Sequence, residues 1–424
     1  MTSRERVRTI LAHKIPDRIP NGLGGCETEG LHIVAYDTLQ KILGLERKPP
    51  RLDTFMTNAV FEEPVIRAME GDILLLASLN MCPSELRGEG IESQWKEQRL
   101  WGRTFSVPVR ERFSEREDGV TVWETAGGAI CPKGCYFFDH PGYTDLLADF
   151  QVPDPDRFHP RDTIADAVLR RLEETAKRLY EETEFSLCLG ECITDLQVAP
   201  GGMVGSMILM KEEPDVMREF LDKCADAGLK QIELLDQAVG KYVDILSVAH
   251  DLGDNRGVTI GAELWREIYK DAYKKYFGGW RKRTKMHVNL HSCGSVAEIL
   301  PDLIECGLEV LNPVQTSAAG MDIPSLKKKF GADLVFWGGA YNPQLIGTEL
   351  GYEEVYEAVR QNVRLLGEGG GFIFAGVHNL PATLPESHIR AMLDAWKAER
   401  DYTDTSVMDP GNRPLRMHSA DLHI

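Results

Sequence analysis

The feature that most constrains the fold of this chain is a set of short apolar runs that alternate with longer segments of helical periodicity. The eight runs cover residues 17–24, 71–77, 185–191, 242–248, 285–291, 308–313, 332–338 and 371–376. Apolar runs of this length, separated by helices, are typical of parallel strands that are covered on both faces. Eight such units predict an α/β fold of the closed (β/α)8 TIM barrel type, with an open doubly wound sheet as the second interpretation.

The segments between the runs are amphipathic, which predicts helices that pack one face against the sheet. Pro214 and Pro385 stand where two of these helices are expected to begin, because proline is favoured in the first helical turn. The clearest helices are expected at 162–182, 214–240, 262–279, 351–366 and 385–399.

One stretch, from about residue 80 to 160, interrupts this alternation and has β-type periodicity. Thr104–Arg112 and Gly119–Thr125 lie around a Glu117-Asp118-Gly119 turn, which is the pattern of a hairpin. We therefore expect residues 1–424 to form a single barrel domain with a β-hairpin-rich insertion after the second strand. The insertion, residues 80–160, is predicted to act as a flap or lid.

The composition excludes several classes of partner. The 66 acidic and 48 basic residues give a formal charge of −18, which argues against nucleic acid or an anionic membrane as partner. No apolar run approaches the ~20 residues that span a bilayer, and the first ten residues are too charged for an export signal. Nine scattered cysteines indicate a reducing environment rather than a disulfide framework. We expect a cytoplasmic enzyme or binding protein for a small molecule.

The fifth run carries the residues with the clearest chemistry. Because side chains alternate between the two faces of a strand, His287, Asn289, His291 and Cys293 share one face of MHVNLHSCG. A strand that is buried on both faces has no reason to carry such a stripe unless each polar group has a partner. His291 and Cys293 come last, at the carboxyl end where barrel enzymes place their active sites. This spacing predicts a zinc site.

Other strand ends supply candidate partners at the same rim. His378 follows the eighth run, so His291, Cys293 and His378 are predicted to be catalytic zinc ligands that leave one position open. Water, substrate, Glu191 or Gln315 remain candidates for that position. The alternative interpretation is that the histidines are hydrogen-bonded core residues. Four further rim residues are predicted to contact the substrate: Met203, Met207, His250 and Gln315. For the two methionines, generic packing is the alternative interpretation.

The order of the motifs resembles the uroporphyrinogen decarboxylase superfamily. The resemblance rests on His291-Ser-Cys-Gly-Ser-Val, Leu311-Asn-Pro-Val-Gln315, Phe336-Trp-Gly-Gly339 and Gly369-Gly-Gly-Phe-Ile373, together with Asp17-Arg-Ile-Pro20 and His250-Asp-Leu-Gly253 upstream. It covers nearly the whole chain and implies a (β/α)8 barrel.

Two chemistries occur in that superfamily. The decarboxylases have an arginine-rich motif near the N-terminus that grips propionates, whereas this chain has Pro20-Asn-Gly-Leu-Gly-Gly-Cys-Glu27 in the corresponding region. The cobalamin-dependent methyltransferases bind zinc through His-x-Cys and a later cysteine. His291 and Cys293 match the first two of these ligands, and His378 stands where the third, a cysteine, is expected.

The histidine in place of a second thiolate predicts a particular activity. One thiolate and two imidazoles leave a zinc site at a formal charge of +1, which suits polarisation of an ether oxygen better than activation of a thiol. We therefore favour O-demethylation of an aryl methyl ether, with Trp337 and Tyr341 as further substrate contacts. No cobalamin-binding Asp-x-His-x-x-Gly segment occurs, so cobalamin is expected on a separate corrinoid protein. The resemblance makes a homodimer plausible.

Two alternatives remain open from the sequence. The first is a decarboxylase that acts on a tetrapyrrole or a related acid. The second is a barrel that binds a metal or a corrinoid without catalysis. The donor and the direction of methyl transfer are not specified by any motif in the chain.

Overall fold

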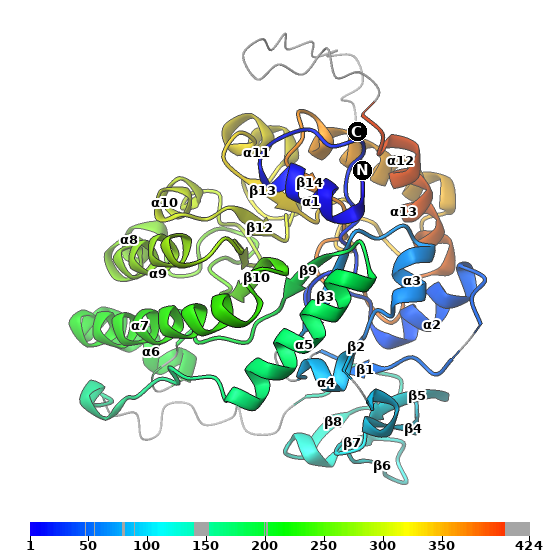
Figure 1. Cartoon of the computed structure of the whole chain (residues 1–424), viewed down its shortest axis with the longest axis horizontal. Coiled ribbons are helices and arrows are strands. Elements are labelled where there is room, and N and C mark those ends of the chain that lie inside the picture. The colour runs from blue at the N-terminus through cyan, green and yellow to red at the C-terminus, as the bar shows by residue number, and fades with distance from the viewer. Residues whose placement is uncertain are drawn as a thin grey trace.

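A seven-stranded parallel sheet, curled into the wall of a barrel, forms the centre of the computed structural model (Figure 1). The strand order is β14-β13-β12-β11-β10-β9-β3. The strands span Ile73–Ala77 (β3), Ser186–Leu189 (β9), Val243–Ala249 (β10), His287–His291 (β11), Val310–Asn312 (β12), Val335–Trp337 (β13) and Phe372–Ile373 (β14). The structure describes residues 1–46, 48–54, 56–78, 81–88, 90–139, 152–198, 200 and 202–402. Six of the seven strands lie within predicted runs and β10 exceeds its run by one residue, so the sheet confirms the α/β barrel class.

The first predicted run closes the barrel without forming a regular strand. Phe374 of the β14 edge donates its N–H to Pro20 O and accepts the Gly22 N–H, both at 2.8 Å. On the other side, the Asp72 N–H donates to Asn21 O at 2.8 Å, just before β3. Proline has no N–H, so this segment cannot form a longer ladder on both of its edges. The eighth position is therefore present as a short hydrogen-bonded segment between β14 and β3.

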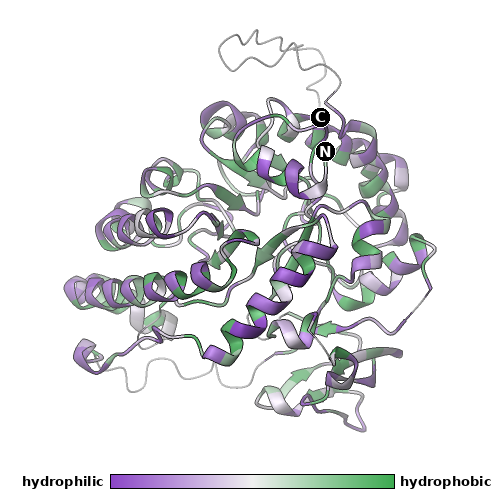
Figure 2. Cartoon of the chain, viewed as in Figure 1, coloured by the Kyte–Doolittle hydropathy of each residue, from purple (hydrophilic) through white to green (hydrophobic). Residues whose placement is uncertain are grey.

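Helices cover the outside of the sheet, and hydrophilic residues line their outward faces (Figure 2). The predicted helices are present, and Pro214 opens the longest of them while Pro385 caps another. Among the described residues, no helix combines the length and apolar character needed to cross a bilayer. The α-helices span Ser3–Leu11 (α1), Ile33–Ile42 (α2), Glu63–Ala68 (α3), Pro83–Leu86 (α4), Asp166–Glu182 (α5), Gly202–Glu212 (α6), Pro214–Val239 (α7), Ala262–Ile268 (α8), Lys270–Arg283 (α9), Leu300–Cys306 (α10), Ile323–Phe330 (α11), Tyr352–Gly367 (α12) and Glu386–Glu399 (α13).

Helix α1 closes the amino-terminal end of the barrel. Its apolar residues Val7, Ile10 and Leu11 join a buried cluster with side chains from the barrel interior, including Ile73 and Val310. Three arginines of α1 hold it there: Arg4 donates to Phe185 O, Arg6 to Asp72 and Arg8 to Asp244. The interior is therefore a packed core that is plugged at this end, and chemistry is left to the opposite rim.

The insertion after β3 is rich in hairpins, as predicted, but the predicted pairing of Thr104–Arg112 with Gly119–Thr125 is wrong: the strand before the 117–119 turn is residues 113–115, and residues 103–108 pair with an earlier strand. Trp95–Leu100 (β4) pairs antiparallel with Arg103–Pro108 (β5), and Phe113–Glu115 (β6), Thr121–Trp123 (β7) and Ala129–Cys131 (β8) form a three-stranded sheet. A separate hairpin, which the sequence did not predict, lies before the insertion and consists of Leu52–Asp53 (β1) and Asn58–Ala59 (β2). An Arg51–Ser106 β-bridge joins this hairpin to the insertion. Tyr136 O lies 3.0 Å from His32 Nε2. Short 3₁₀ helices occupy 91–94, 124–126 and 155–157.

Candidate metal centre

The strand β11 carries the His-x-Cys motif to the carboxyl-terminal rim of the barrel. His291 is its last residue and lies opposite Asn312, the last residue of β12, in the parallel ladder. The ends of the two neighbouring strands, β10 and β12, hold the loop after β11 through its N–H groups: Ser292 donates to Asn312 O at 2.7 Å, Cys293 to Asp251 Oδ1 at 2.9 Å, and Gly294 to Gln315 Oε1 at 2.7 Å. Cys293 is thus fixed directly above the strand.

His378 reaches the same place from the loop after β14. Its ring centroid lies 5.0 Å from that of His291. Cys293 Sγ is 3.5 Å from His291 Nε2, and one ligand atom from each of His291, Cys293 and His378 lies within 4.8 Å of the others. The structure therefore brings together the three residues that the sequence predicted as zinc ligands, from two strands that lie far apart in the chain.

The tautomer of His291 is set by Asn312. The Asn312 Nδ2 group donates to Trp337 O and to Glu29 Oε1, so Asn312 Oδ1 must be the atom that faces His291 Nδ1 at 2.7 Å. His291 Nδ1 therefore carries the proton and donates it. The lone pair of the neutral ring is left on Nε2, the atom nearest Cys293, as a metal ligand requires.

His378 is held differently. Its Nδ1 accepts the N–H of Asn379 at 2.7 Å, so the neutral ring has its proton on Nε2. Binding of a metal by His378 would therefore replace this hydrogen bond at Nδ1 or follow a rotation of the ring. Of the two imidazoles, His291 is the one already oriented for a metal.

Burial dominates the electrostatics of this cluster. It raises the pKa of the Cys293 thiol to about 12, with Asp251 and Glu29 adding to the effect. It lowers the pKa of His378 to about 4, and it also lowers the pKa of His291. Without a cation, all three groups are therefore neutral near pH 7. A cation would remove the cost of ionising the thiol.

The family of the chain follows from a sequence comparison. The family model described as uroporphyrinogen decarboxylase (URO-D) matches residues 160–399, which include β11 and the His378 loop. The chain belongs to the uroporphyrinogen decarboxylase family. No curated protein sequence matches it.

One solved structure shares the fold. A methyltransferase from Methanosarcina mazei is similar with a TM-score of 0.50 and 16% identity, over 94% of this chain and 99% of that chain. A GH10 xylanase from termite gut has a TM-score of 0.35 and 8% identity, over 58% of this chain and 68% of that one. At this identity, the first likeness shows that the fold is shared.

Two other predicted residues of this family member lie at the rim in buried surroundings. Glu191 follows β9 but is not part of the three-residue cluster; its N–H donates to Glu27 Oε2 at 2.7 Å. Burial raises the pKa of Glu191 to about 7, with Asp195 and Asp251 adding to it. His250 Nδ1 lies 2.9 Å from the Tyr273 hydroxyl, and burial lowers the pKa of His250 to about 4.

The remaining predicted substrate contacts are more dispersed. Gln315 is buried and holds the Cys293 loop through Gly294, and Trp337 lies in the closed barrel interior. The Tyr341 hydroxyl lies 2.9 Å from His388 Nδ1, in the packing under α13. Met207 is exposed on α6, while Met203 belongs to α6 with its side chain outside the described part. Their roles toward a substrate stay predictions.

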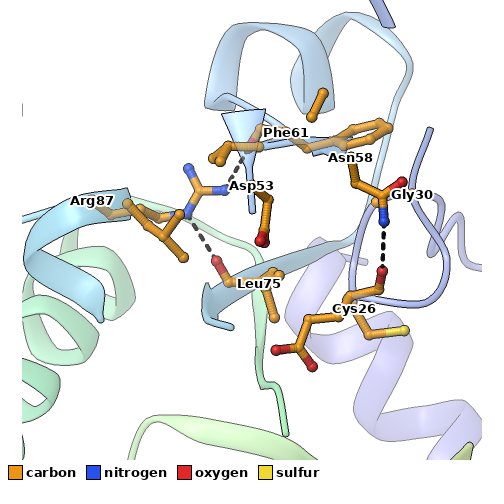
Figure 3. A pocket seen from close by; sticks show the side chains of 12 residues that line it. Cys26, Gly30, Asp53, Asn58, Phe61, Leu75 and Arg87 are labelled. Atoms are coloured by element: carbon orange, nitrogen blue, oxygen red, sulfur yellow. Dashed lines mark hydrogen bonds between the residues drawn. The ribbon is translucent and has the colours of Figure 1, made fainter. Parts of the chain in front are cut away.

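A narrow pocket lies between the 24–30 loop, the middle of β3, the end of α4 and the β1–β2 hairpin (Figure 3). Asp53 points into it, and Arg87 donates across it to the carbonyl oxygens of Leu75 and Phe61. The Asn58 amide donates to Glu27 O at 3.2 Å. None of the residues that line this pocket belongs to the His291, Cys293 and His378 cluster.

Sequence reasoning missed the residues that orient the cluster. Asn312 ends a predicted strand next to β11, so its register could have indicated a contact with His291. Glu29 gave no such signal, because its position beneath the rim depends on the path of an irregular loop.

Proposed function

We propose that this protein is a zinc-dependent methyltransferase that moves a methyl group between a small methylated donor and a separate corrinoid protein. The observation that carries the proposal is the convergence of His291, Cys293 and His378 within 4.8 Å at the carboxyl-terminal rim of a uroporphyrinogen decarboxylase family barrel. The favoured donor is an aryl methyl ether. The shared fold with a methyltransferase supports this assignment.

The donor atoms fit zinc. Two imidazole nitrogens and one thiolate are ligands of the type zinc prefers, and three protein ligands with one open position are typical of catalytic sites. His291 Nε2 already has its lone pair on the side of Cys293. When bound, zinc would supply a Lewis acid for the ether oxygen, and the corrinoid would supply the nucleophile for the methyl carbon.

The chain itself would position and orient these groups. Cys293 would be the anionic ligand, and the Asp251 carboxylate fixes its backbone by accepting its N–H. Asn312 would keep the His291 proton on Nδ1. Because the Asp251 side chain is 59% exposed, it also gives the entrance a negative charge.

That negative charge argues against decarboxylation of a polycarboxylate. Apart from His291, the ionisable side chains that shift the pKa values of Cys293, His378 and Glu191 are acidic, namely Asp251, Glu29 and Asp195, and no lysine or arginine of the described chain is among them. A substrate with several carboxylates would be repelled here. A neutral donor such as an ether is compatible with this surface.

The test combines metal analysis with cobalt spectroscopy. We expect one zinc per chain, and we expect metal-replete protein to change the cobalt spectrum of a reduced cognate corrinoid protein when a methoxyarene is added. Full activity in metal-free protein would overturn the zinc assignment. Zinc-replete protein that leaves the spectrum unchanged with methoxyarenes, but changes it with another methylated donor, would overturn the choice of donor.

The variant His378→Cys tests the role of the formal charge. A second thiolate should retain zinc and bring the formal charge of the site from +1 to 0. Methyl transfer from an ether should then fall by far more than zinc content, because the metal would withdraw less electron density from oxygen. Metal content and methyl-transfer rate are measured on the same preparation. Unchanged ether demethylation would contradict the role of the charge.

The insertion at 80–160 is proposed to act as a lid over the rim. It packs against His32, whose N–H donates to Leu380 O, two residues after His378. Limited proteolysis should cut the insertion preferentially, and the donor with the corrinoid protein should slow that cleavage. If the nicked protein transfers methyl groups at the full rate, the insertion has no function as a lid.

A further inference from the structure

A chain of hydrogen bonds leads away from His291 to a buried carboxyl group. Asn312 stands in the middle and uses all four of its hydrogen-bonding positions. Oδ1 accepts from His291 Nδ1 at 2.7 Å and from Thr28 Oγ1 at 3.0 Å, and Nδ2 donates to Glu29 Oε1 at 2.7 Å and to Trp337 O at 3.4 Å. A saturated amide of this kind cannot turn over without losing its partners.

Glu29 is the unusual member of this chain. Its side chain is completely buried, Oε1 accepts from Asn312, and Oε2 has no hydrogen-bond partner among the described residues. The barrel leaves space for it: a Cβ at Gly338 would lie 2.5 Å from Glu29 Oε1, and the φ of Gly338 is +88°. The backbone of Glu29 is anchored by the Gly24 N–H, which donates to its carbonyl oxygen.

The buried Glu29 carboxyl group with an unpaired oxygen lowers the stability of the folded protein. A buried polar atom without a partner is unfavourable, so packing alone would favour an apolar side chain at this position. Burial also raises the pKa of Glu29 well above its usual value, although the Asn312 bond opposes the rise. The Glu29 carboxyl group contributes to the raised pKa of the Cys293 thiol, so it belongs to the electrostatic environment of the cluster.

We propose that Glu29 is a positioning residue for the metal centre: through Asn312, it fixes the tautomer and orientation of His291. The Glu29 carboxyl group and the Trp337 carbonyl oxygen both accept from the Asn312 amide, so Oδ1 faces the imidazole and the Nε2 lone pair then faces Cys293. Groups that hold a metal ligand in this way contribute roughly 10–100-fold to metal affinity. The inference rests on the zinc site of the proposed function, but not on the donor or the corrinoid partner.

Zinc affinity, measured by competition with a chelator, tests this role. Glu29→Gln keeps an oxygen that can accept from Asn312 but allows the amide to turn, so affinity should fall about 10-fold. Glu29→Leu removes the acceptor and should reduce affinity by about 100-fold. The changes at Glu29 and Asn312→Leu should be less than additive, since both act through one route. Unchanged zinc affinity in Glu29→Leu would overturn the proposal.

A matched control lies at the other end of β11. Glu309 also accepts from a histidine of this strand, with Oε1 3.1 Å from His287 Nδ1, but at the amino-terminal end. Glu309→Gln should leave zinc affinity unchanged. If both glutamine variants weaken zinc equally, the effect reflects general destabilisation of the barrel, and the positioning role is wrong.

A measurement without metal separates this inference from the proposed function. Nitrogen-detected NMR of histidine should show His291 as the Nδ1–H tautomer in the wild type and a mixture of tautomers in Glu29→Gln. This readout stands even if the wild type binds no zinc, which would contradict the proposed function alone. It also decides the matter if Glu29→Leu fails to fold. An unchanged tautomer in Glu29→Gln would overturn the role of Glu29.

Discussion

Replacing Cys293 by alanine is expected to abolish zinc binding and methyl transfer together. Cys293 is the only residue of the three-residue cluster that can be an anionic ligand, and burial raises its thiol pKa to about 12 without metal. The thiol therefore ionises at this buried position only when a cation binds, and the cation binds tightly only to the thiolate. We expect both zinc affinity and the methyl-transfer rate to fall by more than about 100-fold, beyond the loss typical of groups that only orient a ligand.

The measurement is zinc content after gel filtration, compared with the rate of methyl transfer to the corrinoid protein. Cys135→Ala is the matched control, because Cys135 is an exposed free cysteine of the insertion. It should retain full zinc and activity. The fold of Cys293→Ala should survive, since a chain of this length has a sufficient hydrophobic core. Unchanged zinc content in Cys293→Ala would refute the ligand assignment.

The second large effect is expected at the opposite end of the barrel, in Asp72→Ala. The Asp72 side chain is completely buried and pairs with Arg6 Nη1 at 2.6 Å and Arg18 Nη1 at 2.9 Å. It also accepts the N–H of Asn21 at 2.8 Å, the segment that closes the barrel. Removing it leaves the buried Arg6 and the partly buried Arg18 without this partner, and loss of a buried partner of this kind typically costs about 3–5 kcal/mol of unfolding free energy.

Denaturant unfolding of Asp72→Ala measures this loss. Glu386→Ala is the control, because Glu386 pairs with Lys41 and Arg390 at a more exposed position. Exposed ion pairs contribute only about 0–1 kcal/mol, so this variant should unfold close to the wild type. A loss below about 1 kcal/mol in Asp72→Ala would show that Arg6 and Arg18 find other partners or solvent.

Periodicity was sufficient to predict the parallel strands of the barrel. Strands such as β10 and β11 are covered on both faces, so their sequences are apolar over most of their length. The segment around Pro20 was predicted as a strand, but proline limits it to isolated backbone bonds on either edge. The role of α1 as a plug could not be predicted, because the segment is rich in charged residues and its apolar stripe consists of only Val7, Ile10 and Leu11.

The candidate site was predicted in part for a similar reason. His291 and Cys293 share a strand end, and barrel closure brings the His378 loop to the same rim, so their convergence follows from topology. Glu29 and Asn312 lie 283 residues apart in sequence, and their contact depends on side-chain packing that no periodic pattern encodes. The burial of Trp337 and Tyr341 also depends on packing, and strand assignment alone did not reveal it.

The plug formed by α1 has a kinetic consequence. Since Val7, Ile10 and Leu11 fill the amino-terminal end of the barrel, both reactants of the proposed transfer must use the same entrance. A bulky corrinoid protein that docks on this entrance would block the path of a small methyl donor. The donor must therefore enter first and the corrinoid protein second, in a compulsory order. Excess corrinoid protein should then inhibit the enzyme, and this inhibition should be relieved by raising the donor concentration.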